Sequence, residues 1–133
     1  MNHCFALSAQ AEERSNMLPN QQETVKRLME LSRLLDKATD EIAVLDHDFT
    51  VKKAAYEKSY AHTFLTSEGS MDLRKYMAMD KCSQQKLEME IADQLVRACK
   101  ERINTLRSQI SIGQSLSAAI RQQFSAEGTG QYT

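Results

Sequence analysis

A run of apolar residues at alternating separations of three and four begins at Leu28 and continues unbroken to Phe49. This alternation places every member on one stripe of an α-helix, at the a and d positions of a heptad repeat. The stripe consists of Leu28, Leu31, Leu35, Ala38, Ile42, Leu45 and Phe49. The sequence therefore predicts a helix that pairs with another helix in a coiled coil.

The heptad pattern changes after Phe49. The next d position is occupied by Lys52, and the apolar stripe then continues through Tyr56, Tyr60 and Phe64. The spacing of these three aromatic residues is nearer to 3.6 than to 3.5 residues per turn. We therefore expect the supercoil to relax toward straight helices in this part of the chain.

Helix breakers are rare in this chain, which has one proline and four glycines among 133 residues. None of them lies between Gln21 and Thr66, so we expect one helix over residues 20–66, roughly 70 Å long at 1.5 Å per residue. Asn20 is a suitable N-cap, and Glu23 follows three residues later as in a capping box. Residues 1–19, which end at the only proline, are expected to form a flexible N-terminal segment.

A second apolar pattern follows Gly69 and predicts a helix over residues 71–126. Gly128 and Gly130 are expected to end it and to leave a flexible tail over residues 127–133. At two points the pattern admits a choice, between Arg102 and Ile103 and between Leu116 and Ser117. Its other members are Leu73, Met77, Leu87, Ile91, Leu95, Ala98, Leu106, Ile110, Gly113, Ile120 and Phe124.

Two long helices joined by the short bend 67–70 must lie side by side in opposite directions. The expected fold is all-α: a helical hairpin, over residues 20–126, in which two antiparallel helices form a coiled coil. The residues expected to make helix-packing or oligomer contacts are Leu31, Leu35, Ile42, Leu45, Ile110, Gly113, Ser117 and Ile120.

Other apolar residues lie off the predicted seams. A lone hairpin would leave them exposed, so we expect the protein to form a homo-oligomer, as a dimer or larger bundle, or to cover them with a partner. These residues are Met29, Leu34, Val44, Val51, Met79, Met89 and Val96.

The bend contains residues that are suited to ending one helix, reversing the chain direction and starting the next helix. Gly69 can adopt the left-handed conformation at a helix end, Ser70 can cap the next helix, and Asp72 complements its dipole. Charged residues surround these positions, which makes the bend either a docking point or a salt-bridged cap. The expected contact residues of this hairpin tip are Glu68, Gly69, Ser70, Asp72, Arg74 and Lys75.

Residues 108–121 are rich in serine, alanine and glycine for a helix. A glycine inside a helix costs about 1 kcal/mol relative to alanine. Gly113 therefore indicates close approach of another backbone, either from the first helix or from a second subunit, or else a glycine that a long helix tolerates. Both interpretations remain open at this point.

Catalytic and metal-binding patterns are not evident. His47 lies between two aspartates, but adjacent helical residues point about 100° apart and cannot chelate one ion. No HExxH, phosphate-binding loop or nucleophile elbow occurs in the sequence. We therefore expect a protein that is not an enzyme and uses no cofactor or metal.

Charge and cysteine usage point to a reduced, intracellular setting. The formal net charge is −1, which gives no bulk attraction to nucleic acid or to anionic lipid. The three cysteines are odd in number and form no CxxC pair, which favours free thiols. Residues 4–7 are too short an apolar run for a signal peptide or a membrane span, so we expect a cytoplasmic protein with no membrane partner.

A group of lysines and tyrosines has two interpretations. Aromatic rings interleaved with cations can stack on bases while the cations track phosphates, so direct nucleic-acid contact is one of them. The same aromatics are four residues apart on one helix face, which favours a buried stripe with lysines beside it. The residues concerned are Lys52, Lys53, Tyr56, Lys58 and Tyr60.

Two tracts, AYEKSYAHTFLTSEGSMDLRKYMAMDKC and RINTLRSQISIGQSLSAAIRQQ, resemble a group of small, all-helical proteins encoded by tailed bacteriophages and prophages. The shared pattern is a Tyr/Ala-rich helix end, an EGS bend followed by RK, and a late LRSQIS tract with a serine–alanine–arginine run. It covers about residues 54–122. The resemblance implies a bacterial host cell and a role near recombination and single-strand handling, and it supplies no catalytic residues.

The expected function is that of an accessory protein in phage DNA recombination or replication, which acts through contacts with another protein. A structural or scaffolding part in virion assembly is one alternative, because the same coiled coil would serve there. Direct binding of single-stranded nucleic acid is the other.

Overall fold

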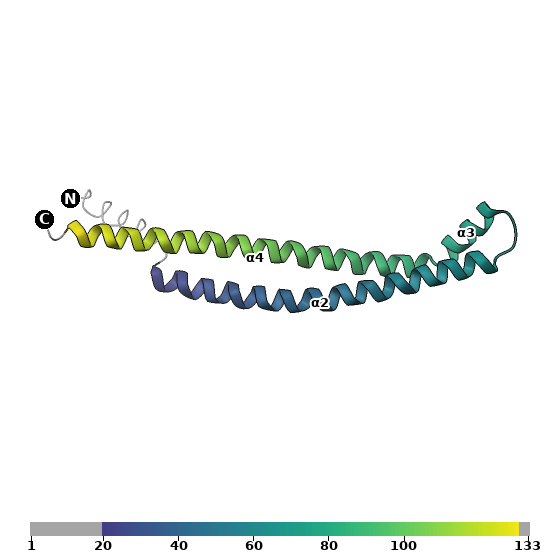
Figure 1. Ribbon diagram of the computed structural model, residues 1–133, viewed down its shortest axis with the longest axis horizontal. Coiled ribbons are helices and arrows are strands. Elements are labelled where there is room, and N and C mark those ends of the chain that lie inside the picture. The colour runs from purple at the N-terminus through teal and green to yellow at the C-terminus, as the bar shows by residue number, and fades with distance from the viewer. Residues whose placement is uncertain (1–19, 131–133) are drawn as a thin grey trace, which may run out of the picture. The chain divides into compact units, whose positions relative to one another are not determined.

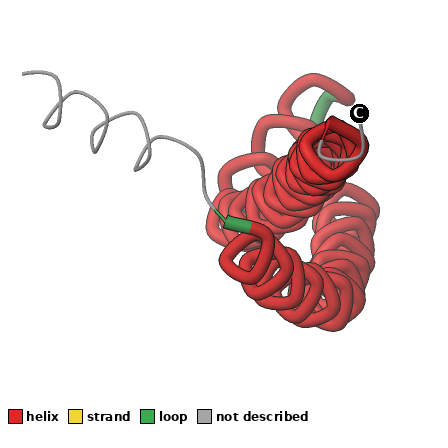
Figure 2. The backbone as a smooth tube through the Cα atoms, turned by 90° about the vertical axis from the view of Figure 1, so that its left-hand side faces the viewer, coloured by secondary structure: helices red, strands yellow, loops and turns green. Residues whose placement is uncertain are grey.

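The computed structural model describes residues 20–130, and helix accounts for almost all of that backbone (Figures 1 and 2). The helices are α2 (Gln21–Thr66), α3 (Met71–Lys81) and α4 (Ser83–Gly130). No strand occurs in the described range, so the all-α class is confirmed. The expectations for residues 1–19 and for residues 131–133 lie outside the described range.

The contacts divide the chain into two compact units. Of the described residues, the first combines 20–34 with 106–130, and the second is the continuous segment Leu35–Thr105. Helices α2 and α4 contribute residues to both units, whereas α3 belongs wholly to the second.

Asn20 and Glu23 start α2 through two reciprocal hydrogen bonds. The amide N–H of Glu23 donates to Asn20 Oδ1 at 2.8 Å, and the amide N–H of Asn20 donates to a Glu23 carboxylate oxygen at 3.4 Å. Thr24 Oγ1 donates to the Asn20 carbonyl oxygen at 3.1 Å. This is the capping box that the sequence predicts, and it satisfies amide groups that the first helical turn leaves without partners.

The connection between α2 and α3 reverses the chain at Gly69, whose φ of 113° is the one positive value in the described residues. The Ser70 side chain then caps α3 by accepting a hydrogen bond from the Leu73 amide at 3.2 Å. On the other side, the Ser67 amide donates to the Thr63 carbonyl at 3.0 Å and closes the end of α2. Glycine is suited to this φ because a Cβ would clash there.

A single helix over residues 71–126 is wrong, because the helix is interrupted at Cys82. Cys82 has φ −101° and ψ 10°, and its N–H donates to the carbonyls of Ala78 and Asp80. Ser83 Oγ also donates to the Asp80 carbonyl at 2.9 Å, which offers the backbone a local alternative to helical bonding. Neither glycine nor proline occurs at the break, so no strong sequence signal marks it. At its other end α4 continues to Gly130, beyond the expected residue 126.

The first half of the expected seam on the second helix is also wrong. Its large apolar members are about half exposed, at 50% for Leu87, 48% for Ile91 and 49% for Leu95, and Leu73 and Met77 are exposed as well. Apart from the half-buried Asp93 and Leu116, which lie beside the stripe, the buried and half-buried positions instead alternate at separations of three and four from Cys82 onward. They are Cys82, Gln85, Met89, Ala92, Val96, Cys99, Ile103, Leu106, Ile110, Gly113, Ser117 and Ile120.

Small residues explain this choice of face. Cys82, Ala92 and Cys99 are buried, and such side chains let a neighbouring helix approach closely. Val96, expected on the exposed surface, is 3% exposed and belongs to the core. Met29, Val44, Val51 and Met79 are exposed as expected, whereas Leu34 and Met89 are half-buried.

On α2 the alternation of three and four persists beyond Phe49. Lys52, Tyr56 and Ser59 are half-buried, and Thr63 is buried. Tyr60 and Phe64, which the sequence analysis placed on the stripe, are half-buried beside it. The covered positions thus keep the heptad period to the end of α2, and the expected change of period at Lys52 is absent from the burial pattern.

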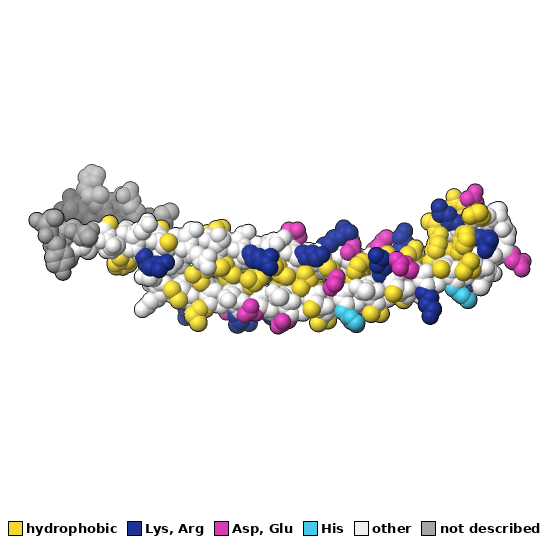
Figure 3. All heavy atoms as spheres, in the orientation of Figure 1, with side chains coloured by type: hydrophobic (Ala, Val, Ile, Leu, Met, Phe, Trp, Pro, Cys, Tyr) yellow, Lys and Arg dark blue, Asp and Glu magenta, His cyan; other side chains and the backbone are white. Residues whose placement is uncertain are grey.

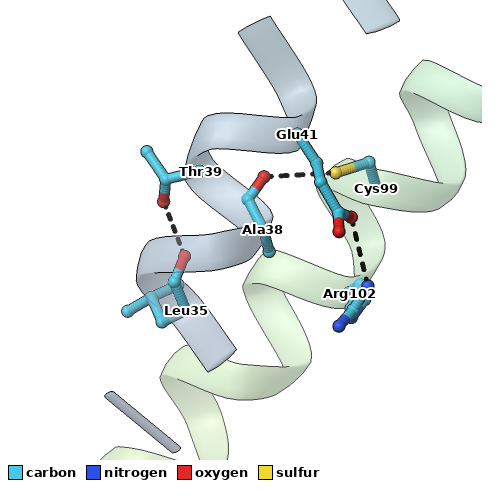
Figure 4. Close-up of polar contacts among 6 residues, drawn as sticks. All are labelled: Leu35, Ala38, Thr39, Glu41, Cys99 and Arg102. Carbon is cyan, nitrogen blue, oxygen red and sulfur yellow. Dashed lines mark hydrogen bonds and ion pairs between the residues drawn. The ribbon is translucent and has the colours of Figure 1, made fainter. Parts of the chain in front are cut away.

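Within the second unit, α2 and α4 run in opposite directions. Near the end of α2, Thr63 Oγ1 lies 3.9 Å from Sγ of Cys82, which directly precedes α4. Ala38 lies earlier in α2, and it contacts Cys99, which lies further along α4. The Cys99 thiol donates to the Ala38 carbonyl oxygen at 3.4 Å, and Arg102 lies 3.3 Å from Glu41 (Figure 4). Ala38 has no exposed surface, so the two helices approach closely here.

Within the first unit, Leu28 of α2 packs on Gly113 of α4. A Cβ added to Gly113 would lie 2.7 Å from Leu28 Cδ2. Of the interpretations that the sequence left open, this geometry supports close approach, and the group that approaches is a leucine side chain of the first helix. Gly113 therefore provides the space that Leu28 occupies.

Candidate functional site

The expected contact residues of the tip divide into exposed and packed groups. Glu68, Gly69, Ser70, Asp72 and Lys75 are exposed. Arg74 is different, because it is half-buried and its guanidinium is bound to Phe64 of α2. Nε donates to the Phe64 carbonyl oxygen at 3.0 Å, and Cζ lies 4.8 Å from the centre of the Phe64 ring.

This arrangement corrects the expectation that Arg74 is a contact residue of the tip available to a partner. The Phe64 carbonyl belongs to the last turn of α2, where carbonyl oxygens lack helical partners and attract cations. Arg74 therefore stabilises the end of α2 and is not free to bind another molecule. Across the described residues, the charged side chains of the tip form no ion pair with one another, so a salt-bridged cap is not the arrangement found.

Helix α3 carries an unusual amount of uncovered apolar surface. Only Ala78 is buried in this helix of 11 residues. Figure 3 shows apolar side chains gathered over α3. The exposed large apolar residues, which we call the α3 surface, are Met71, Leu73, Tyr76, Met77 and Met79.

Two of these side chains are largely open to solvent, with exposed fractions of 72% for Met71 and 67% for Tyr76. Asp72 and Lys75 are interspersed among them and are exposed too. Large apolar side chains left exposed together on one element are typical of protein-binding sites. Methionine is favoured at such sites because its flexible thioether adapts to different partners.

The charged residues near the bend predicted the contact site, whereas its exposed apolar residues were not predicted. Leu73 and Met77 were expected in a covered seam, and α3 was not expected to be separate from α4. The signal that was present is the density of large apolar residues between Met71 and Met79, which exceeds what one helix stripe can cover.

The predicted helix-packing residues lie in the covered positions of both helices. Leu31, Ser117 and Ile120 are buried, and the remaining residues of the set are half-buried. The half-buried members are Leu35, Ile42, Leu45, Ile110 and Gly113. Whether any of them also contacts a second copy stays a prediction.

The lysine–tyrosine group does not form an open stacking surface. The rings of Tyr56 and Tyr60 pack on each other at 6.1 Å between centroids and at an angle of 52°, and both are half-buried. Lys52 forms an ion pair with Asp48 at 3.0 Å. Lys53 and Lys58 are exposed. The geometry thus agrees better with an apolar stripe bordered by lysines than with a base-binding platform.

An apolar hollow of about 300 Å³ lies in the first unit. Its lining includes the apolar residues Leu28, Leu31 and Leu116 and the charged residues Glu23 and Arg27. It lies beside the Leu28–Gly113 contact, so it provides room for Leu28 to move. Its lining brings no set of convergent catalytic side chains together.

Glu30 and Arg33 form a surface pair in which the pKa values of both side chains are shifted. Arg33 donates to the Glu30 carboxylate at 3.2 and 2.7 Å, which lowers the pKa of Glu30 and raises the pKa of Arg33. Both side chains are solvent-accessible and sit one helical turn apart. Such pairs support a helix slightly and are not evidence of a catalytic site.

Two other kinds of site are absent from the described residues. No group of three or more His, Cys, Asp or Glu side chains is arranged to hold a metal ion. None of the helices within residues 20–130 combines the length and the apolar character needed to cross a membrane. No protein-family model, curated protein or solved structure matches this chain.

Proposed function

We propose that this chain is a non-enzymatic interaction protein, built as an antiparallel coiled-coil hairpin that presents the α3 surface to another protein. The observation that carries the proposal is the exposure of Met71, Leu73, Tyr76, Met77 and Met79 on one short helix. Burying an apolar side chain of this size contributes roughly 1.5–3 kcal/mol, so a few of them supply a substantial part of a binding free energy.

The coiled coil supports this proposal as a scaffold. On both long helices the covered positions alternate at three and four, which is the spacing that knobs-into-holes packing requires. The short connection between α2 and α3 is fixed by Gly69, Ser70 and Arg74, so the α3 surface is held on a defined support. Binding surfaces on rigid elements lose less entropy on association.

The biological setting of the proposal rests on the resemblance of residues 54–122 to phage and prophage proteins. We place the protein in the cytoplasm of a bacterial host, as an accessory factor in phage DNA recombination or replication. Self-association is also part of the proposal, because large apolar side chains such as Leu87, Ile91 and Leu95 remain half exposed in the single chain.

Affinity capture from the cells that make the protein tests this function. The wild-type chain, a Tyr76→Glu/Met77→Glu variant and a Val44→Glu control are used as baits, with nuclease added so that nucleic acid cannot bridge. Val44 is 70% exposed and lies on α2, away from α3 in sequence. We expect one protein partner with the wild type and the control, and its loss from the α3 variant.

The identity of the captured protein distinguishes the alternatives. Recombination or replication enzymes support the proposed role, whereas capsid or tail proteins would assign the chain to virion assembly. Equal capture by the α3 variant and the wild type would contradict the assignment of the α3 surface. Salt-sensitive retention of the purified protein on single-stranded DNA would instead favour direct nucleic-acid binding.

A further inference from the structure

Methionine is concentrated on the α3 surface. Five methionines lie in the described residues 20–130, and three of them belong to α3, which has 11 residues. These three, called the α3 methionines below, are Met71, Met77 and Met79, with exposed fractions of 72%, 45% and 46%. Within α3 only Arg74 and Ala78 are covered or half-covered, and they lie four residues apart on one side of the helix. The α3 methionines therefore lie outside the part of α3 that packs on the rest of the protein.

The other two described methionines have different surroundings. Met29 of α2 is 71% exposed, and it belongs to the first unit, whereas α3 belongs to the second. Met89 of α4 is half-buried among the covered positions of that helix. The chain thus contains an exposed methionine outside the α3 surface and a partly covered one, which serve as internal references for the reactivity of the α3 methionines.

Met79 also borders a hollow of about 360 Å³ in the second unit. The lining of this hollow includes Tyr56 of α2 and Leu87 of α4. A polar group added to Met79 would therefore lie beside apolar side chains of both long helices.

We propose that the α3 methionines form an oxidation switch, in which a hydroperoxide converts them to methionine sulfoxides and the oxidised α3 surface no longer binds its partner protein. The proposal rests on the function proposed above for the α3 surface and adds the regulation of that surface. The free protein is the sensitive form, because a bound partner covers the thioethers.

The reaction balances with the hydroperoxide as the oxidant. A lone pair on the methionine sulfur attacks the outer peroxide oxygen, so that an S–O bond forms as the O–O bond breaks. The proton of the attacked oxygen moves to the leaving oxygen, which departs as water or as an alcohol. Sulfur is oxidised by two electrons and the peroxide is reduced by two. A methionine sulfoxide reductase restores the thioether, with thiols as the electron donors.

Oxidation at these positions should act on binding and not on folding. A sulfoxide is polar and carries a strong hydrogen-bond acceptor, whereas the thioether is flexible and apolar. In the free protein the new oxygens can bind water, because the α3 methionines are exposed. In a complex the same oxygens would be buried against apolar groups, which is unfavourable unless donors are provided. The cost therefore falls on association.

Mass mapping after treatment with hydrogen peroxide tests the accessibility of the thioethers. A Cys4→Ser background is used, Cys82 and Cys99 are retained because they are buried, and dithiothreitol is added afterwards to reverse thiol oxidation. We expect sulfoxides at Met29 and at the α3 methionines before Met89 reacts, with an unchanged circular dichroism spectrum. Loss of helicity, or reaction of Met89 as fast as the α3 methionines, would overturn the proposal.

Affinity capture with an oxidised bait tests the switch itself. The bait is oxidised first and the peroxide is removed before the cell extract is added. We expect capture of the partner to fall by about ten-fold or more, since the interface must desolvate the sulfoxides. Reduction of the oxidised bait with methionine sulfoxide reductases should restore capture, and no recovery would overturn the proposal.

Leucine variants assign the effect to particular residues. Met71→Leu/Met77→Leu/Met79→Leu retains apolar side chains of similar volume without an oxidisable sulfur, so its capture should not respond to peroxide. Met29→Leu is the matched control and should remain as sensitive as the wild type. Loss of capture by the triple variant after peroxide would show that another residue is responsible and would overturn the proposal.

The capture experiment also distinguishes this proposal from the function on which it rests. Failure of the untreated wild-type bait to capture a protein would overturn the proposed function and the switch together. Capture that is equal before and after oxidation of the α3 methionines would overturn the switch alone and leave the α3 surface as a binding site.

Discussion

Arg74 and Phe64 join α3 to the end of α2, with the Arg74 Nε 3.0 Å from the Phe64 carbonyl oxygen and the guanidinium carbon 4.8 Å from the ring centre. Arg74→Ala should lower the free energy of unfolding by about 1–2 kcal/mol, since it removes a charge-assisted hydrogen bond and a cation–π contact that are partly open to solvent. Urea unfolding followed by circular dichroism measures this change.

Lys75→Ala is the matched control for Arg74→Ala. Lys75 is exposed and forms no ion pair in the described part of the chain, so its removal should change the unfolding free energy by less than about 0.5 kcal/mol. If the two variants are equally stable, the Arg74–Phe64 contact contributes nothing to the fold.

Gly69→Ala tests the backbone of the connection. A φ of 113° is strained for any residue with a Cβ, and the new methyl group would lie 2.8 Å from Leu73 Cδ2. We expect a loss of about 1–3 kcal/mol in unfolding free energy. Gly128→Ala should be neutral or slightly stabilising, because Gly128 is helical with nothing within 4 Å of the added Cβ. A tolerated Gly69→Ala would argue against this chain reversal.

Leu31→Asp tests the covered stripe of α2. Leu31 is 3% exposed, so the variant buries a charge without a partner and should cost more than about 3 kcal/mol, enough to unfold much of a marginally stable protein. Leu45→Asp should cost less because Leu45 is half-buried. Val44→Asp, one position away and exposed, should leave the melting curve close to that of the wild type. Helicity retained by Leu31→Asp would refute the assignment of the stripe.

A double-mutant cycle tests the contact of Leu28 with Gly113. In the Leu28→Ala background, Gly113→Ala should stabilise the protein by about 1 kcal/mol through its helix propensity. With Leu28 present the gain should shrink, because the side chain must turn away from a Cβ at 2.7 Å. The same gain in both backgrounds would show that the two residues do not interact.

Sequence patterns predicted the all-α class and the cap at Asn20, because both depend on local spacing. They failed where a choice between two stripes depended on the neighbouring helix. From Cys82 to Leu106 the α4 segment has one stripe rich in small residues and another with Leu87, Ile91 and Leu95. The larger side chains favoured the stripe with Leu87, Ile91 and Leu95 as the covered one. The close approach of α2 at Ala38 and Cys99 instead covers the stripe of small residues.

The sequence predicted where the candidate site lies, but not which of its residues are exposed. The charged residues near Gly69 identified the right segment, yet Arg74 binds Phe64 and the apolar residues of α3 are the uncovered ones. The break at Cys82 could not be predicted from the sequence. The interactions found there are a serine–carbonyl hydrogen bond and a contact with Thr63, and neither has a sequence signature.

Photo-cross-linking from the α3 surface tests the central claim most directly. A photoreactive amino acid is placed at Tyr76 in one version of the protein and at Val44 in another, and both are irradiated in the cells that make the protein. We predict that position 76 yields a discrete cross-linked product with one other protein and that position 44 does not. Products of equal yield from both positions, or none from position 76, would contradict the assignment of α3 as the binding surface.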